Sequence, residues 1–155
     1  MLHVALLEPE IAGNVGNIAR TCVGAGAELH LIRPYGFRLS DAAVRRAGMD
    51  YWQDTKLTEH VSFESFQNAF SEIFTAQRVF AYTTKATARY SSVTYRDGDV
   101  LLFGPESRGL PEVVRESCTQ VRIPMQPDAR SLNLAVSVGI GLYEAWRQVG
   151  QPETS

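Results

Sequence analysis

The residues whose types and spacing could support binding chemistry follow two short apolar runs in the last third of the chain. Residues 101–103 stop at Gly104 and Pro105, and residues 121–123 stop at Pro124. Glycine lets a backbone approach a ligand closely, and proline removes a backbone donor. Open α/β sheets bind ligands beyond the carboxyl ends of their strands. We therefore expect the two turns to form two walls of one pocket, suited to an adenosine-like ligand.

A polar loop and the longest helical pattern of the chain follow the second run. Residues 125–130 are typical of a loop. Ser131 or Asn133 can cap the helix, because a side-chain oxygen there accepts from the free N–H groups of the first turn. Apolar residues then recur at helical spacing up to Gly150, which ends the helix.

Runs typical of strands alternate with helical patterns along the whole chain. The expected strands are residues 2–7, 29–32, 51–57, 79–83, 101–103 and 121–123. The expected helices are residues 14 or 17 to 23, a short helix capped by Ser40 that runs to residue 47, a stretch capped by Ser62, and 134–149. This alternation predicts an α/β fold with a mostly parallel sheet and helices on both faces. A phenylalanine stripe in the Ser62 helix is predicted to be core rather than a stacking platform. We expect one domain over residues 1–150 and a frayed tail over 151–155.

Composition limits the class of protein. The chain has 155 residues, 45% hydrophobic and 21% charged, which is typical of one globular domain. A net charge of −2 argues against a protein that coats nucleic acid, although a local basic patch stays open. Cys22 and Cys118 are far apart, which favours a reduced cytoplasmic protein over a disulfide scaffold or a zinc site. We expect neither a signal peptide nor a membrane span, because no apolar run approaches about 18 residues.

Several well-known catalytic and metal-binding motifs are absent from the sequence. Residues 13–16 follow a strand and open a helix, the right place for a phosphate site, but they do not form G-x-G-x-x-G. There is no Walker A sequence, no H-E-x-x-H and no G-x-S-x-G. His3, His30 and His60 are scattered along the sequence, and a lone strand histidine such as His30 is expected to be structural. We expect no metal site.

Three motifs become specific when they are taken together. The first is EPEI at residues 8–11 with NxGNIxR at 14–20, the second is FGPESRGLP at 103–111, and the third is IPM at 123–125 with RSLNL at 130–134. In this order they resemble the SPOUT-class RNA 2′-O-ribose methyltransferases, most closely the small single-domain branch that acts on the wobble cytidine or uridine of tRNA. The resemblance covers nearly the whole chain, with no added RNA-binding domain.

The resemblance implies a parallel sheet with a C-terminal trefoil knot that binds S-adenosylmethionine, and transfer of its methyl group to a ribose 2′-hydroxyl. It also implies a homodimer in which the partner chain completes each site. The positions that match the family's cofactor contacts are Tyr82, Gly104, Ile123 and Ser131, with Glu106, Met125, Leu132 and Asn133 nearby. The family residue at Tyr82 is usually aliphatic, so we expect a backbone contact there.

The general base proposed for the resembling family is the arginine of the first motif, here Arg20. Arginine is effectively always protonated. An alternative is that Arg20 holds the adjacent RNA phosphate and lowers the pKa of the hydroxyl electrostatically. A third interpretation is that Arg20 only pairs with Glu8 or Glu10.

Other polar residues are candidates for contact with the tRNA anticodon stem-loop. They are Asn14, Asn17, Arg45, Arg46, Lys85, Arg108, Arg130 and Tyr143. Asn14 and Asn17 could instead only cap the first helix, and Tyr143 could face either RNA or a dimer partner. Since the chain is net acidic, we expect tRNA binding to weaken with salt and to need two patches pooled in a dimer.

Three other functions remain open. The first is a methyltransferase of the same class that acts on rRNA or on another tRNA site, and the catalytic motifs do not separate it. The second is a non-catalytic RNA-binding assembly factor, against which the retention of all three motifs argues. The third is a generic nucleotide-binding module, which should prefer a phosphorylated nucleotide to S-adenosylmethionine.

Overall fold

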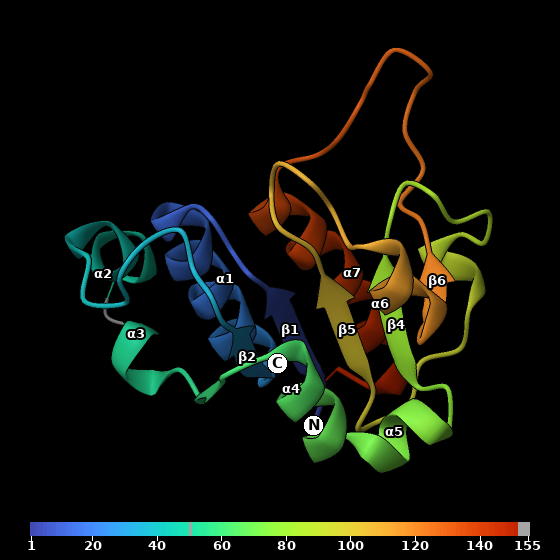
Figure 1. Ribbon diagram of the computed structural model, residues 1–155, viewed down its shortest axis with the longest axis horizontal. Helices are drawn as coiled ribbons and strands as arrows, with labels where there is room; N and C mark the ends of the chain where they lie inside the picture. The colour runs from blue at the N-terminus through green and yellow to red at the C-terminus, as the bar shows by residue number, and fades with distance from the viewer. Residues whose placement is uncertain (50, 152–155) are drawn as a thin grey trace.

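A six-stranded, all-parallel sheet forms the centre of the protein (Figure 1). The computed structural model describes residues 1–49 and 51–151, so most of the predicted tail, 152–155, lies outside the described residues. The strands are β1 (His3–Leu7), β2 (Glu28–Ile32), β3 (Leu57–His60), β4 (Val79–Tyr82), β5 (Val100–Phe103) and β6 (Thr119–Val121). They lie in the order β3-β2-β1-β5-β4-β6, which places β1 and β5 side by side at the centre.

Helices cover both faces of the sheet, as predicted. One face carries α1 (Ala12–Ala25), α2 (Ala42–Gly48) and α7 (Leu134–Val149), with the single turn α3 (Tyr51–Asp54) against α1. The other face carries α4 (Phe63–Ala69), α5 (Ser71–Thr75) and α6 (Glu112–Glu116). A 3₁₀ turn, η1 (Tyr90–Ser92), lies in the connection between β4 and β5. Within the described residues, no helix is both long and apolar enough to span a bilayer.

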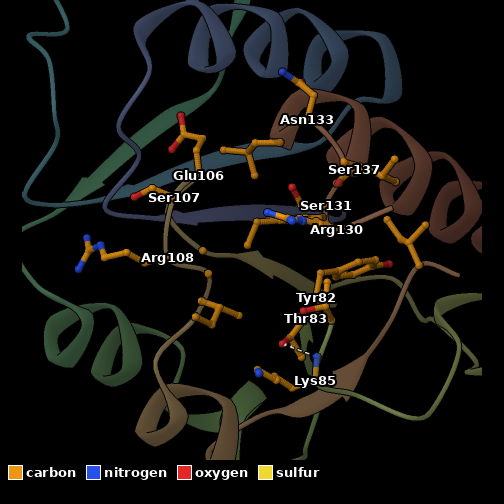
Figure 2. A pocket seen from close by; sticks show the side chains of 18 of the residues that line it. Tyr82, Thr83, Lys85, Glu106, Ser107, Arg108, Arg130, Ser131, Asn133 and Ser137 are labelled. Atoms are coloured by element: carbon orange, nitrogen blue, oxygen red, sulfur yellow. Dashed lines mark hydrogen bonds between the residues drawn. The ribbon is translucent and has the colours of Figure 1, made fainter. Parts of the chain in front are cut away.

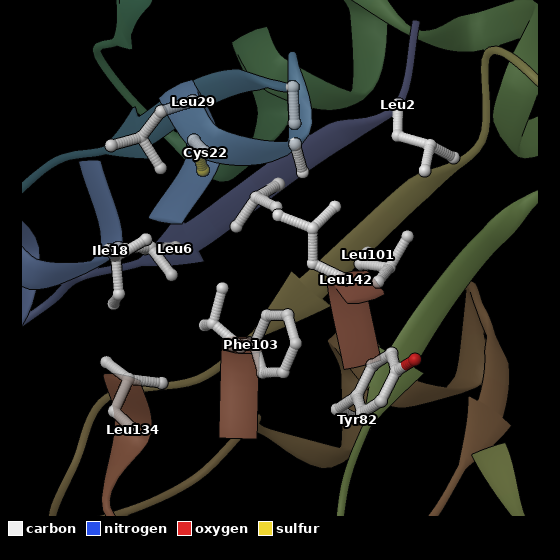
Figure 3. Packing of buried hydrophobic residues seen from close by; sticks show 14 of the residues in the cluster. Leu2, Leu6, Ile18, Cys22, Leu29, Tyr82, Leu101, Phe103, Leu134 and Leu142 are labelled. Atoms are coloured by element: carbon white, nitrogen blue, oxygen red, sulfur yellow. The ribbon is translucent and has the colours of Figure 1, made fainter. Parts of the chain in front are cut away.

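Side chains alternate between two cores along each central strand, because successive residues of a strand point to opposite faces. In β1, Val4 and Leu6 pack under α1 and α7, whereas Ala5 and Leu7 face α4 and α6. Figure 3 shows the first of these cores, in which Leu6, Ile18 and Leu142 come from β1, α1 and α7. The sheet is therefore buried on both faces, and the ends of its strands are left accessible to a ligand.

Several local predictions are confirmed. Ser62 caps α4 in a capping box with Ser65, and Phe66 of the phenylalanine stripe is fully buried. Asn133, the second of the two proposed caps, accepts a hydrogen bond from the Val136 backbone N–H at 3.2 Å and starts α7.

Other boundaries were predicted wrongly. Residues 51–57, expected as a strand, form helix α3 followed by a loop, and the strand lies at 57–60. The reason is that Leu57 pairs with Leu29 of β2 while Trp52 packs into the core under α1. Helix α2 is capped by Asp41, not Ser40, since the Asp41 carboxylate accepts from the Ala43 N–H at 2.8 Å.

The three histidines are scattered along the sequence, and the structure brings them together. His3, His30 and His60 lie on β1, β2 and β3, on the sheet face that α4 covers. Burial, with the charges of the other two rings, lowers the pKa of His30 to about 3. His30 is therefore not isolated, because each of its ring nitrogens lies 3.0 Å from another histidine, and its structural role stays a prediction.

Candidate functional site

A cavity of about 490 Å³ opens at the carboxyl ends of β4, β5 and β6 (Figure 2), within the size range of small-molecule sites. Its walls are the two turns predicted from the apolar runs, together with the start of α7. The structure brings all the residues assigned to cofactor contact to this cavity: Tyr82, Gly104, Glu106, Ile123, Met125, Ser131, Leu132 and Asn133. The cavity mixes apolar walls with polar side chains.

Further lining residues were not singled out from the sequence. Thr83 follows β4, and its Oγ1 accepts from the Lys85 backbone N–H at 3.1 Å. Leu110 and Arg115 come from the turn after β5 and from α6. Ser137 lies one helical turn after Asn133, so helical spacing from the cap could have identified it.

The turn after β5 closes tightly on itself. A Cβ on Gly104 would lie 2.5 Å from the backbone carbon of Gly109 and the nitrogen of Leu110, so only glycine fits there. Gly109 adopts a φ of 69° and donates to the Pro105 carbonyl at 2.9 Å. The Arg115 guanidinium then donates to the Leu110 carbonyl at 2.8 Å. These contacts hold the turn in one shape.

Two glutamates clamp this turn to the loop after β1. The Glu106 carboxylate accepts from the backbone N–H groups of Glu10 and Ile11, both at 2.8 Å. In return, the Glu10 carboxylate accepts from the Ser107 backbone N–H at 2.7 Å and from its hydroxyl at 2.8 Å. These bonds lower the pKa of Glu10. We call this set of bonds the glutamate clamp.

Asn14 extends the clamp to α7. Its side-chain NH₂ donates to Glu106 at 3.2 Å, and its oxygen accepts from Asn133 at 3.2 Å. The loops after β1 and β5 and the start of α7 thus share one hydrogen-bonded network. The interpretation of Asn14 and Asn17 as caps is wrong, because α1 already begins at Ala12 and both asparagines lie inside it.

The Tyr82 side chain points away from the cavity mouth into the core. Its ring stacks on Phe103 at 4.5 Å between centroids (Figure 3). Its hydroxyl donates to the Tyr95 hydroxyl at 2.6 Å, since Tyr95 itself donates to the Tyr90 carbonyl. Burial raises the pKa of Tyr82. A Cβ on Gly141 of α7 would lie 2.7 Å from this ring, so the helix needs glycine there. The missing side chain at Gly141 leaves room for the Tyr82 ring beside the cofactor cavity.

Arg20 lies in a second, shallower hollow between α1, α3 and α7, together with Asn17, Thr21, Gly24, Tyr51, Gly139 and Tyr143. Its guanidinium lies over the Tyr51 ring at 5.6 Å from the centroid. Six residues separate Arg20 from Asn14, roughly 9 Å of rise and a third of a turn around α1. Arg20 therefore lies outside the lining of the cofactor cavity.

The interpretation that Arg20 only pairs with Glu8 or Glu10 is wrong. Within the described residues the Glu8 carboxylate accepts from Arg108 at 3.4 Å, and the Glu10 carboxylate is held by Ser107. The hollow instead places the guanidinium next to polar and aromatic side chains at the surface.

The residues assigned to RNA contact fall into three groups. Asn14, Lys85, Arg108 and Arg130 line the cofactor cavity. Asn17 and Tyr143 lie beside Arg20 in the second hollow. Arg45 and Arg46 are exposed on α2 and line neither. In this one chain, the structure does not bring the three groups to a single site.

Comparison with known proteins shows similarity over almost the whole chain. Residues 1–143 match the SpoU rRNA Methylase family. The chain is 48% identical over 155 residues to the tRNA (cytidine(34)-2′-O)-methyltransferase of Escherichia coli K12, covering 98% of this chain and 96% of the relative. The corresponding Yersinia pestis protein is 45% identical over 157 residues, covering 98% of this chain and 96% of the relative.

Solved structures show the same similarity in three dimensions. A structure determined to study 2-OH methylation of C/U34 on tRNA matches with a TM-score of 0.91 and 50% identity, covering 96% of this chain and 95% of the other. The S-adenosylmethionine-bound rRNA methyltransferase of Sinorhizobium meliloti matches with a TM-score of 0.83 and 32% identity, covering 97% of this chain but 57% of the other.

Proposed function

Because this chain belongs to the SpoU rRNA Methylase family, whose fold implies the C-terminal trefoil knot, we propose that it is an S-adenosylmethionine-dependent tRNA methyltransferase. It methylates the ribose 2′-hydroxyl of nucleotide 34, a cytidine or uridine at the wobble position. The observation that carries this proposal is the end-to-end match, at 48% identity, to the Escherichia coli tRNA (cytidine(34)-2′-O)-methyltransferase. One catalytic domain, residues 1–150, performs the reaction.

The lengths of the relatives favour tRNA over rRNA as the substrate. The chain covers 96% of the Escherichia coli tRNA enzyme but only 57% of the Sinorhizobium meliloti rRNA enzyme. The rRNA enzyme therefore has a large additional part that this chain does not match.

The cavity fits the cofactor in size and in chemistry. Phe103, Leu110, Ile123 and Leu134 supply apolar surface for an adenine ring, while polar side chains stand around the mouth. Gly104, which the closely packed turn requires, lies in the cavity wall. We assign cofactor contact to Tyr82, through its backbone, and to Gly104, Glu106, Ile123, Met125, Ser131, Leu132 and Asn133. When bound, S-adenosylmethionine supplies a methyl group already activated on a sulfonium sulfur.

The chain itself has to position the ribose and assist the loss of its 2′-hydroxyl proton. We assign Arg20 to this task as a cation that holds the neighbouring phosphate through two N–H groups and stabilises the developing alkoxide. A guanidinium acts in this role while it remains protonated.

A homodimer resolves the separation of Arg20 from the cofactor cavity. Several large apolar side chains are exposed around α1, α3 and α7, among them Tyr51 and Tyr143 at 41% and Val136 at 51%. A second copy packed on this surface would bury them and could bring its own Arg20 to the cavity of the first. Exposed apolar patches of this kind mark interaction surfaces.

The remaining assignments follow from this arrangement. We assign eight residues to contact with the tRNA anticodon stem-loop. They are Lys85, Arg108 and Arg130 at the cavity, Arg45 and Arg46 on α2, and Asn14, Asn17 and Tyr143. Since the two arginines of α2 lie apart from the cavity in one chain, they contact RNA bound across the dimer. A tRNA-modifying enzyme of this kind works in the cytoplasm.

A methyl-transfer assay tests the proposed function. The protein is incubated with methyl-labelled S-adenosylmethionine and unmodified total tRNA, and the tRNA is digested to nucleosides. Labelled 2′-O-methylcytidine or 2′-O-methyluridine mapped to the anticodon loop supports the proposal. Label in another nucleoside or at another site overturns the substrate, and the absence of both label and cofactor binding overturns the enzyme.

A further inference from the structure

The chain's three histidines form a connected row, remote from the cofactor cavity. His3 Nδ1 lies 3.0 Å from His30 Nε2, and His30 Nδ1 lies 3.0 Å from His60 Nε2. Glu28 adds a carboxylate to the first pair, with oxygens 3.9 Å from His3 Nδ1 and 3.7 Å from His30 Nε2. One ligand atom from each of His3, Glu28 and His30 thus lies within 4.8 Å of the other two.

We propose that His3, Glu28 and His30 form a binding site for a divalent transition-metal cation of the Zn²⁺ type. Zn²⁺ bonds to imidazole nitrogen and carboxylate oxygen at about 2.0–2.2 Å, so ligand atoms at tetrahedral angles lie roughly 3.3–3.6 Å apart. The two nitrogens lie 3.0 Å apart, each lies 3.7–3.9 Å from a different oxygen of Glu28, and one ligand atom from each residue lies within 4.8 Å of the other two. Small side-chain shifts therefore complete the geometry, and water takes the fourth position.

The sheet holds the three ligands on one face. His3 and Glu28 are direct partners in the register of β1 and β2. His30 lies two residues after Glu28 and so points to the same side of the sheet. All three positions are set by backbone pairing within a parallel sheet, so the site needs no loop to close around the ion.

A second layer of contacts fixes the ligands, as in established metal sites. For Nε2 of His30 to bind the ion, its proton must lie on Nδ1, and His60 Nε2 is placed to accept that proton in a hydrogen bond. The Thr58 hydroxyl donates to Glu28 at 3.0 Å. The Phe70 ring packs edge-on against His30 at 5.0 Å between centroids. These contacts restrain the His30 ring and the carboxylate.

The exposure of the ligands gives the ion a route from solvent. The side chains of His3 and Glu28 are 19% and 28% exposed, whereas that of His30 is 4% exposed. His3 and Glu28 begin their strands, at the edge of the sheet opposite the cofactor cavity. The ion therefore stabilises the contact between β1 and β2 and takes no part in methyl transfer.

The test is metal binding by the full chain, purified without a histidine tag and treated with chelator. Zn²⁺ is titrated in competition with a chromophoric chelator, and thermal unfolding is followed with and without Zn²⁺. We expect one Zn²⁺ per chain and a raised melting temperature. His3→Asn and Glu28→Gln should each raise the Kd at least about tenfold and abolish the thermal shift.

Glu59→Gln is the matched control, because it removes a carboxylate from the strand that carries His60 without touching the row. It should retain both the Kd and the thermal shift. His3 and Glu28 are partly exposed, so circular dichroism is expected to show both variants folded. The proposal is overturned if the folded wild-type chain does not bind Zn²⁺ stoichiometrically. It is also overturned if His3→Asn with Glu28→Gln binds Zn²⁺ as tightly as the wild type.

Discussion

Glu106 shows how one side chain can shape a cofactor site without being the only contact in it. Its carboxylate accepts from two backbone N–H groups and from Asn14, tying the β5 turn to the β1 loop. Glu106→Gln keeps the size of the side chain but replaces one acceptor oxygen by a donor, which then faces another donor. We expect the free energy of unfolding to fall by about 1–3 kcal/mol and the Kd for S-adenosylmethionine to rise.

Urea unfolding and calorimetric titration of the cofactor measure these two effects. Glu116→Gln, on an exposed position of α6, is the control and should change neither. If Glu106→Gln and the wild type bind S-adenosylmethionine with equal affinity, the glutamate clamp does not shape the cofactor site.

Glu10 predicts a pH dependence of the same clamp. Hydrogen bonds from the Ser107 backbone and hydroxyl lower the pKa of Glu10 below its ordinary 4.5. A lowered carboxyl pKa means that the clamp contributes fully above pH 4.5 and is lost as the pH falls through the folded-state value. Ser107→Ala removes the hydroxyl bonds, so the pKa of Glu10 should rise toward 4.5. Carbon-detected NMR titration of the Glu10 carboxyl measures the change, and an unaltered pKa in the variant would contradict it.

At the scale of elements, the contact between α7 and β4 depends on a missing side chain. Gly141→Ala places a methyl group where Tyr82 already lies. Overpacking costs about 1–3 kcal/mol, more than the gain of up to about 1 kcal/mol from helix propensity. We expect a lower free energy of unfolding, and partial recovery when Tyr82→Leu is added. The Tyr95 hydroxyl keeps its acceptor, the Tyr90 carbonyl, in that double variant.

Gly13→Ala is the control for this substitution. Gly13 also lies in a helix, but a Cβ there meets nothing within 4 Å, so the variant should be as stable as wild type or more so. Urea unfolding compares five proteins: the wild type, Gly141→Ala, Tyr82→Leu, the double variant and Gly13→Ala. If the effects of Gly141→Ala and Tyr82→Leu simply add, the contact does not limit the packing of α7.

The elements differ in how far the sequence alone predicts them. Strand ends marked by Gly104, Pro105 and Pro124 are local signals, and they located the cavity correctly. The strand expected at residues 51–57 failed because pairing with β2, a distant segment, decides where β3 begins. The glutamate clamp and the histidine row join residues far apart in the chain. No local spacing signals such contacts, and the knot followed from family resemblance alone.

At the scale of the whole molecule, the proposed homodimer predicts that each site combines residues of two chains. A dimer is prepared by co-expressing one chain carrying Arg20→Ala with another in which Ile123→Arg fills the cofactor cavity. Each variant dimer alone should be inactive, and Arg20→Ala should still bind the cofactor. The mixed dimer should recover about half of the wild-type activity, because one of its two sites combines an intact cavity with an intact Arg20. A mixed dimer as inactive as its parents would place Arg20 and the cavity in the same chain.

The central claim is transfer of a methyl group to the 2′-hydroxyl of nucleotide 34. The most direct test compares three tRNAs assembled with synthetic anticodon segments: one all-ribose, one with 2′-deoxyribose at nucleotide 34, and one with 2′-deoxyribose at nucleotide 33. Labelled methyl transfer should occur on the first and third and be lost on the second. Transfer that persists on the tRNA lacking the hydroxyl at nucleotide 34 would contradict the account.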